Sequence, residues 1–224
     1  YMKPTRVPRR YGIHSIFGPT IQGEGAMSGV TCIFIRFTGC NMWDGRPETR
    51  ETSICPFCDT DFLKGTMLTI PQIVATIQDL RSPGTGWIWI SGGEPSMQLD
   101  KPLVLALKQQ GFMIGVETNG TRQFKDGTLS NVDHLVMSPK LPAEQIEQRW
   151  CNSLKVLYPH PNPLIQPEHF LDIRCDSRWL QAIEADTKEE SIQNMNATIN
   201  RLYELPRAHK WKLSVQTHKT IGVE

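Results

Sequence analysis

Residues 39–61 read GCNMWDGRPETRETSICPFCDTD, and this segment places three cysteines in one predicted loop. Cys40 is separated by fourteen residues from Cys55, which opens the tight turn Cys55-Pro56-Phe57-Cys58. Three cysteines can hold an iron–sulfur cluster through three of its irons and leave the fourth iron open to a small molecule. A structural zinc site usually takes four protein ligands. The number of cysteines therefore points toward a reactive metal centre.

A structural zinc site is the alternative that the same cysteines allow. Cys32 or His14 could supply the fourth ligand, and zinc is the commoner occupant of a C-x2-C turn. On the three cysteines alone zinc is slightly favoured. The choice between the two centres therefore depends on the motifs in the rest of the chain.

Composition limits the classes of protein to which the chain can belong. Its 224 residues suit one domain with a full core, and 24 basic against 23 acidic residues give a net charge of +1. Such a balance gives no basic field for nucleic acid. The sequence has no apolar run of transmembrane length and no signal peptide, so we expect a cytoplasmic protein without membrane partners. The remaining cysteines, far apart in sequence, are expected to be ordinary thiols: Cys32, Cys151 and Cys175.

Apolar patterning predicts alternating strands and helices. Residues 1–12 are basic and broken by prolines, so we expect a flexible N-terminal arm followed by a single domain over residues 13–224. Strands are predicted at 13–17, 31–37, 87–90, 112–116, 134–137, 154–157, 179–183 and 211–215. Helices are predicted from Thr69 to before Pro83, through Leu103 and Leu107 to Gly111, and from Lys188 to Leu205.

This alternation favours an α/β fold with a parallel sheet, because a parallel neighbour needs a crossover connection and a helix usually supplies it. The helices are too few for a closed eight-unit barrel. We therefore expect a partial, open (βα) barrel with about six parallel strands and reduced helices. Its open side would admit a sizeable ligand.

Polar motifs follow several of the predicted strands. They are Ser91-Gly92-Gly93-Glu94-Pro95, Glu117-Thr118-Asn119-Gly120 and Ser138-Pro139-Lys140. Motifs that follow parallel strands gather at the carboxyl edge of the sheet, where such folds place their sites. Arg36 interrupts the apolar strand 31–37 and is either a surface residue or a buried anion clamp, of which the clamp is favoured.

Together these motifs resemble a radical S-adenosylmethionine (radical SAM) enzyme, and within that superfamily the 7-carboxy-7-deazaguanine synthase family of queuosine and 7-deazapurine biosynthesis. The resemblance also rests on Thr20-Ile21-Gln22-Gly23-Glu24-Gly25, Phe37-Thr38-Gly39-Cys40-Asn41, Cys58-Asp59-Thr60-Asp61 and Gln216-Thr217-His218-Lys219. It spans nearly the whole chain. The commonest superfamily spacing is C-x3-C-x2-C, so the fourteen-residue first gap is a departure, although some synthases of this family carry such an insertion.

The resemblance implies a lyase that converts 6-carboxy-5,6,7,8-tetrahydropterin to 7-carboxy-7-deazaguanine with loss of ammonia. A 4Fe–4S cluster on Cys40, Cys55 and Cys58 would bind SAM and cleave it to a 5′-deoxyadenosyl radical, which abstracts hydrogen from the substrate. The implied SAM-binding residues are Gly92, Gly93, Glu94, Glu117, Asn119, Ser138, Pro139, Lys140 and Gln181. Ala182 stands where the family often has a proline.

The resemblance also assigns the substrate and magnesium ligands. The implied pterin-binding residues are Ile21, Gln22, Gly23, Glu24, Arg36, Ser91 and the C-terminal Glu224, where a proline is often found. Thr60 corresponds to a Mg2+ ligand that assists the ring contraction. The implied partners are a second copy of the chain in a homodimer and an electron donor such as flavodoxin or ferredoxin.

Two other functions are compatible with the residues taken alone. One is a radical SAM activase that makes a glycyl radical on a partner protein. The other is a non-enzymatic zinc-binding module. A brown protein after anaerobic purification would favour either enzyme, and a colourless protein with one zinc per chain would favour the module.

Overall fold

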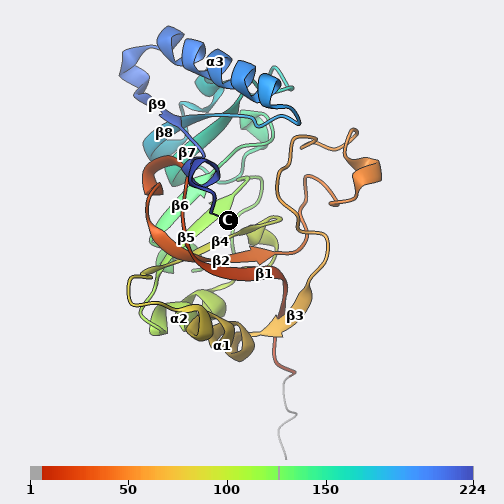
Figure 1. The fold of residues 1–224 in the computed structure, drawn as a ribbon, viewed down its shortest axis with the longest axis vertical. Helices are drawn as coiled ribbons and strands as arrows, with labels where there is room; N and C mark the ends of the chain where they lie inside the picture. Colours follow the sequence, from red (N-terminus) through yellow and green to blue (C-terminus); the bar gives the residue numbers. More distant parts are fainter. Residues whose placement is uncertain (1–6, 126, 224) are drawn as a thin grey trace, which may run out of the picture.

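The computed structural model describes residues 7–125 and 127–223, which form an α/β fold around one large, mostly parallel sheet (Figure 1). Its strand order is β3-β1-β2-β4-β5-β6-β7-β8-β9. The strands are β1 Arg10–Ile21, β2 Thr31–Phe37, β3 Thr66–Thr69, β4 Trp87–Gly92, β5 Met113–Thr118, β6 His134–Met137, β7 Trp150–Tyr158, β8 Arg174–Ala182 and β9 Trp211–Ser214. The α-helices are α1 Ile70–Leu80, α2 Lys101–Gln109, α3 Lys188–Glu204 and α4 Thr217–Ile221.

Parallel pairings run without interruption from β2 through β4, β5, β6, β7 and β8 to β9. Seven strands therefore share one direction in the described chain, where the sequence analysis expected about six. The two remaining strands, β1 and β3, pair antiparallel at one edge. The α/β class predicted from the sequence is confirmed, because each parallel neighbour along the sheet is reached by a crossover.

Strand β2 explains how the sheet separates core from site. Ile33, Ile35 and Phe37 are fully buried in the main apolar core, whereas the alternate residues Phe34 and Arg36 line a cavity on the other face. Successive side chains of a strand point to opposite faces. The single sequence TCIFIRF therefore builds both the core and one wall of the cavity.

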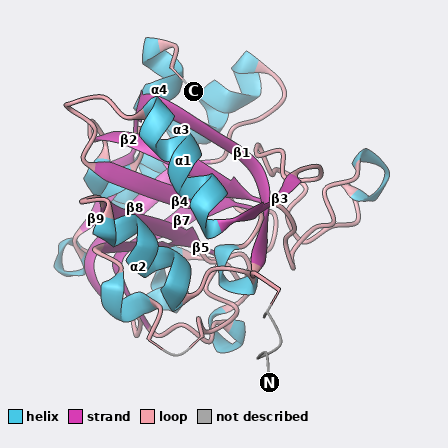
Figure 2. Ribbon diagram, turned by 90° about the horizontal axis from the view of Figure 1, so that it is seen from below, coloured by secondary structure: helices cyan, strands magenta, loops and turns pink. Residues whose placement is uncertain are grey.

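Helices cover the core side of the sheet. Helix α1 begins with a capping box between Thr69 and Gln72 and buries Ile73 and Ile77, and α2 lies against it (Figure 2). Helix α3 contacts β7, β8 and β9. Between β5 and β8 the described chain crosses through 3-10 turns instead of α-helices. The expected shortage of helices thus falls in the middle of the chain. Among the described residues no helix is long and apolar enough to span a membrane.

The predicted arm over residues 1–12 is too long at its C-terminal end. Strand β1 begins at Arg10, and Tyr11 is fully buried with its hydroxyl donating to Asp100 Oδ1 at 2.7 Å. Burial of an aromatic ring with a bonded hydroxyl holds this segment in the sheet. Residues 1–6 of the arm, like Glu224 at the other terminus, lie outside the described residues.

Candidate active site

A cavity of about 570 Å³ opens at the carboxyl edge of the parallel strands. Its walls come from Arg36 at the end of β2, Ser91 in β4, Glu117 in β5, Leu157 in β7 and Gln181 in β8. This volume is within the usual range for small-molecule sites. The polar motifs predicted to gather at this edge therefore do meet in one place.

Nearly all of the predicted site residues line this cavity. The lining includes Ile21, Gln22, Gly23, Glu24, Arg36, Cys40, Cys55, Cys58, Thr60, Ser91, Gly92, Gly93, Glu94, Glu117, Asn119, Ser138, Lys140 and Gln181. Pro139 does not line it, although both of its neighbours do. The cavity also reaches the C-terminal Val223, whereas Glu224 lies outside the described residues.

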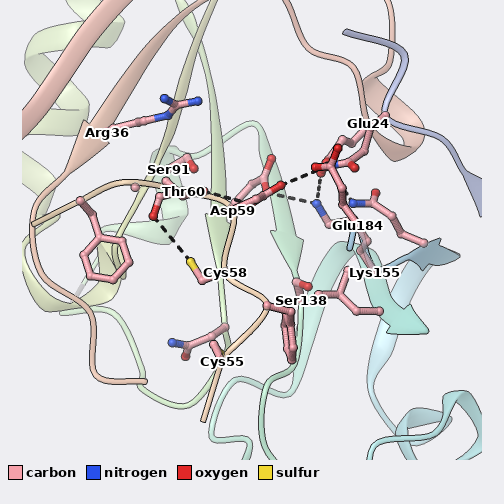
Figure 3. Close-up of a pocket in the computed structure, with 18 of the residues that line it drawn as sticks. Glu24, Arg36, Cys55, Cys58, Asp59, Thr60, Ser91, Ser138, Lys155 and Glu184 are labelled. Carbon is pink, nitrogen blue, oxygen red and sulfur yellow. Dashed lines mark hydrogen bonds and ion pairs between the residues drawn. The ribbon is translucent and has the colours of Figure 1, made fainter. Parts of the chain in front are cut away.

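The three cysteines of the opening segment share this cavity as free thiols. Burial raises the pKa of each thiol, that of Cys55 to about 12. Cys58 Sγ donates a long hydrogen bond to the Thr60 carbonyl (Figure 3). Within the described residues no three His, Cys, Asp or Glu side chains converge to hold a single metal ion. The thiols fit a cluster by their chemistry, since iron–sulfur clusters are held by cysteine thiolates, each of which binds its own iron.

Neither residue considered as a fourth zinc ligand lines the cavity. Cys32 is fully buried in a separate cluster with Trp89 and Val136, and burial raises the pKa of its thiol to about 12. The ring nitrogen Nδ1 of His14 contacts the Lys64 carbonyl at 2.7 Å. These two side chains are engaged elsewhere in the fold.

The Gly92-Gly93 pair lets the turn after β4 pack against the first cysteine loop. The backbone N–H of Gly93 donates to the Phe37 carbonyl at 2.9 Å, and that of Glu94 donates to the Gly39 carbonyl at 2.8 Å. A Cβ on Gly92 would lie 2.3 Å from the Phe37 nitrogen. Glycine is the one residue without a Cβ. The motif therefore fixes the loop that carries Cys40, besides exposing backbone to the cavity.

Glu94 links this turn to the end of β5. Its side chain is almost fully buried, and Oε1 accepts from the Ser96 N–H and the Thr118 hydroxyl. Oε2 accepts from the Asn119 N–H at 2.8 Å. Because a carboxylate oxygen has two lone pairs, Oε2 retains acceptor capacity for a ligand in the cavity.

A buried lysine to which no role was assigned from the sequence lies across the cavity from Arg36 and Ser91 (Figure 3). Lys155 in β7 is 5% exposed and bonds the carboxylates of Glu24 and Glu117 (Figure 3). Burial would lower the pKa of Lys155, but the two carboxylates outweigh it and raise that pKa. Likewise burial would raise the pKa of Glu24, and the Lys155 charge lowers it. Lys155 and Glu24 are therefore both charged at neutral pH.

Arg36 lies near Ser91 on the other side of the cavity (Figure 3). Its guanidinium stacks over the Phe17 ring at 4.7 Å from the centroid. Arg36 therefore presents its guanidinium at the cavity wall, on the face of an aromatic ring.

The C-terminal segment closes the cavity against the C-x2-C turn. Lys219 in α4 bonds Asp59, which follows Cys58, at 3.0 Å and also pairs with Glu184. Burial would raise the pKa of Asp59, whereas Lys219 lowers it. The Thr217 N–H donates to the Gly23 carbonyl at 3.0 Å. The Gly23 turn, the cysteine loop and α4 are thus joined around one opening.

Lys140 projects into the cavity beside the cysteines. Its ammonium donates to the Ser138 carbonyl at 2.9 Å and to the Ser138 hydroxyl at 2.6 Å. Burial lowers the pKa of Lys140. The segment after β6 therefore presents a fixed amine and hydroxyl to any ligand between the thiols and β7.

The chain has full-length relatives among curated proteins, although no family model matches it. A 7-carboxy-7-deazaguanine synthase of Bradyrhizobium diazoefficiens is 38% identical over 221 residues, which cover 95% of this chain and 99% of the relative. A protein of the same name from Caulobacter vibrioides is 35% identical with the same coverage. The chain belongs to the 7-carboxy-7-deazaguanine synthase family. The resemblance inferred from the motifs is thereby confirmed.

A solved structure supports the fold of this synthase family. The crystal structure of QueE from Escherichia coli superposes with a TM-score of 0.60 and covers 92% of this chain and 94% of that chain. Its sequence identity is 24%, so the likeness concerns the fold. The α/β architecture with its large sheet is therefore shared with a solved protein.

Within this synthase, sequence reasoning missed Lys155, Asp59, Glu184 and Lys219 as wall residues. Lys155 had a usable signal, because a lone cation in the apolar run Leu154-Lys155-Val156-Leu157 needs an anion. The same argument had identified Arg36. For Glu184 and Lys219 the sequence offers no comparable signal, since both lie outside the predicted strands and helices.

Proposed function

We propose that this chain converts 6-carboxy-5,6,7,8-tetrahydropterin to 7-carboxy-7-deazaguanine with loss of ammonia, as a radical SAM lyase. The observation that supports this most is that one cavity unites three thiols with an arginine, a serine and a glycine-rich turn from separate strands. Membership of the 7-carboxy-7-deazaguanine synthase family indicates the product of the reaction. The cavity contains residues suited to binding both SAM and the pterin. A protein-docking activase would have no need for such a set of small-molecule contacts.

Cys40, Cys55 and Cys58 would hold a 4Fe–4S cluster, and SAM would lie against other residues of the same cavity: Gly92, Gly93, Glu94, Asn119, Ser138, Lys140 and Gln181. When bound, these cofactors supply a 5′-deoxyadenosyl radical, with an electron from a donor such as flavodoxin or ferredoxin. The protein must orient the reactants and exclude water. Glu94 Oε2 would accept from the SAM ammonium, since it keeps a free lone pair in the cavity.

The pterin would occupy the other half of the cavity. Arg36 would bind the carboxylate of the substrate through its planar fork, which matches a carboxylate bidentately. Ser91, beside it in register with Arg36, would donate its hydroxyl. The backbone of Ile21, Gln22 and Gly23 would bind the ring, where Gln22 is held by a 3.1 Å bond to Glu117.

Thr60 would contribute to a Mg2+ site that bridges protein and substrate. Thr60 lines the cavity, and its hydroxyl donates to Asp59 Oδ1 at 3.3 Å. Mg2+ keeps several waters and binds through few protein oxygens together with substrate oxygens. One hydroxyl on the wall is therefore a sufficient protein contribution.

At the level of the whole molecule, we propose that the sheet forms an open, partial barrel of radical SAM type and a single domain. The linear strand order leaves β3 and β9 at opposite edges, which supports an open rather than closed barrel. We further propose a cytoplasmic homodimer whose product feeds queuosine or another 7-deazapurine. The C-terminal carboxylate of Glu224 remains a candidate substrate contact on the grounds that Val223 reaches the cavity.

The test is anaerobic turnover of the reconstituted protein with SAM and the carboxylated tetrahydropterin. Mass spectrometry should detect 7-carboxy-7-deazaguanine only when both are present. Cleavage of SAM with an unchanged pterin would instead indicate a radical SAM enzyme with another substrate. A colourless protein with one zinc per chain and no SAM cleavage would indicate a zinc-binding module.

A further inference from the structure

Lys155 is the central residue of a group of three charged side chains on the cavity wall, the other two being Glu24 and Glu117. Its side chain is 6% exposed, and its ammonium bonds Glu24 Oε2 and lies 3.3 Å from Glu117 Oε2. The three residues come from different parts of the fold: the Gly23 turn, the end of β5 and the middle of β7. A buried ion pair of this kind carries a desolvation cost, so its presence in a ligand cavity calls for a functional explanation.

Neutral donors hold the far oxygen of each carboxylate. Glu24 Oε1 accepts from the side-chain amides of Gln181 at 2.9 Å and Gln216 at 2.8 Å. Glu117 Oε1 accepts from the Trp89 indole at 2.7 Å and from Gln22 at 3.1 Å. Each carboxylate is thus fixed at one end by two neutral donors and at the other by Lys155.

The two carboxylates differ in how much hydrogen-bond acceptor capacity they leave for a ligand. Glu24 receives two amide donors and the closer contact to Lys155, and its side chain is 14% exposed. The Glu117 side chain is 23% exposed, and its Oε2 meets Lys155 at a longer distance. Glu117 Oε2 is therefore the oxygen of this group that can accept a further hydrogen bond from a ligand.

We propose that Lys155 is a positioning residue that holds Glu117 as a hydrogen-bond acceptor for the N–H groups of the substrate ring, in place of the SAM contact that the resemblance implied for Glu117. Lys155 does so by separating the Glu117 carboxylate from that of Glu24. This inference rests on the proposed function, because it takes the pterin to be the ligand. A pterin ring carries several N–H donors, and an ionised carboxylate accepts without donating.

Other charged groups also surround this site. The charge of Asp59 in the cysteine loop acts to raise the pKa of Glu24. The charge of Glu117 acts to raise the pKa of three neighbours, His134 of β6, Cys32 of β2 and Lys140 after β6. Lys140 directs its ammonium to Ser138. Among the described residues, Lys155 is the cation that bonds both carboxylates.

Removal of Lys155 would leave two partly buried carboxylates without the cation that both of them bond. Like charges in one site raise the pKa of one of the two, so that the pair retains a proton into the neutral range. A protonated Glu117 would donate a hydrogen bond where the ring needs an acceptor. The expected result is a shift in the pH dependence of kcat/KM for the pterin, which a merely destabilised enzyme would not show.

The experiment compares reconstituted wild-type enzyme with Lys155→Met, Lys155→Arg and Lys108→Met. Lys108 is a matched control, because it also pairs with a carboxylate, Asp133, but lies outside the cavity. Iron content checks that each variant folds and loads its cluster. The readouts are kcat/KM for the pterin across a pH series and pterin affinity by anaerobic titration.

We expect the acid limb of kcat/KM to move up by about one pH unit or more in Lys155→Met, which is a tenfold change in proton concentration. Lys155→Arg should keep the limb near its wild-type position, and Lys108→Met should overlay the wild type. A Lys155→Met profile that is lowered without being shifted would overturn the inference. If Lys155→Met loads no iron, Glu117→Gln decides, with a pterin affinity at least about tenfold weaker expected for loss of a charged acceptor.

An unchanged affinity in Glu117→Gln would also overturn the inference. If the proposed function itself is wrong, the result differs, because wild-type enzyme would then neither bind nor consume the pterin. Wild-type turnover together with an unshifted Lys155→Met profile would leave the function standing and reject only the role of Lys155.

Discussion

Gly93 packs so closely on Gly39 that a Cβ at position 93 would lie 1.8 Å from the Gly39 carbonyl oxygen. This contact joins the turn after β4 to the loop that begins the cysteine segment. The neighbouring Glu94 N–H donates to the same carbonyl. The position of Cys40 is therefore set by a backbone contact that a side chain at residue 93 would prevent.

We predict that Gly93→Ala displaces the Cys40 loop and lowers the iron content of the reconstituted protein. The clash is with backbone, which cannot rotate away, so the cost should reach or exceed about 1–3 kcal/mol, the range for overpacking. The measurement is iron per chain together with the melting temperature. Gly84→Ala is the matched control, because a Cβ there has no neighbour within 4 Å. Equal iron content in the two variants would contradict this role for Gly93.

The second prediction separates the cluster cysteines from the others. Replacement of Cys40, Cys55 or Cys58 by Ala should abolish cluster loading, because all three line the cavity. Replacement of Cys151 or Cys175 should leave iron content unchanged, because these two face each other in register between β7 and β8. The readout is iron and sulfide per chain. Loss of the cluster on changing Cys151 alone would show the assignment wrong.

The third prediction concerns the pH dependence of stability. Lys155 lowers the pKa of Glu24 from its ordinary 4.5, so the unfolded chain takes up this proton more readily than the folded one. The pair therefore stabilises the fold above about pH 4.5, and this stabilisation is lost as the pH falls through the lowered pKa. The pKa of Lys155 is raised above its ordinary 10.5. Its contribution is therefore complete below 10.5 and is lost only as the pH rises beyond that value.

Lys155→Met should accordingly lower the free energy of unfolding by about 3–5 kcal/mol, the range for removing one partner of a buried ion pair. Denaturant unfolding of both proteins across a pH series measures this difference. We expect a constant difference at pH values above the neutral range and below 10.5, and a smaller one toward acid, where the carboxyl pair of the variant and then Glu24 of the wild type take up protons. A difference that grows as the pH falls would contradict the pairing.

The fourth prediction is that Arg36→Lys weakens pterin binding by about 1.5–3 kcal/mol, the range for a hydrogen bond to a charged group. Lysine keeps the charge but loses the planar fork and the stacking on Phe17. SAM affinity should stay nearly intact, since the SAM contacts come from other strands. Pterin and SAM affinities measured side by side decide, and equal weakening of both would reject Arg36 as the carboxylate clamp.

Buried strands were the most predictable part of this fold. Thr31–Phe37 and His134–Met137 form strands at the predicted bounds, because apolar and β-branched runs of that length leave few alternatives. Strands β7 and β8 are longer than predicted, since polar residues such as Asn152 interrupt their apolar pattern. The short strand β3 and helix α4 were missed, because four or five residues carry too little periodicity.

The site could be predicted where its residues formed local motifs. The glycine-rich turn after β4 is such a case, as is the C-x2-C turn. The partners of Lys155 could not, since Lys155 is 131 residues from Glu24 and 38 from Glu117 in sequence. Only the folded sheet brings these three residues together. Arg36 was found because its isolation within one apolar strand is itself visible in the sequence.

The central claim is tested most directly by the stoichiometry of one anaerobic reaction. Reconstituted wild-type protein, SAM, Mg2+, a reductant and the carboxylated tetrahydropterin are combined, and pterin, 7-carboxy-7-deazaguanine and ammonia are quantified together over time. One deazaguanine and one ammonia should form for each pterin consumed, and neither should form when SAM is omitted. Consumption of SAM without any deazaguanine or ammonia would rule out the proposed lyase activity.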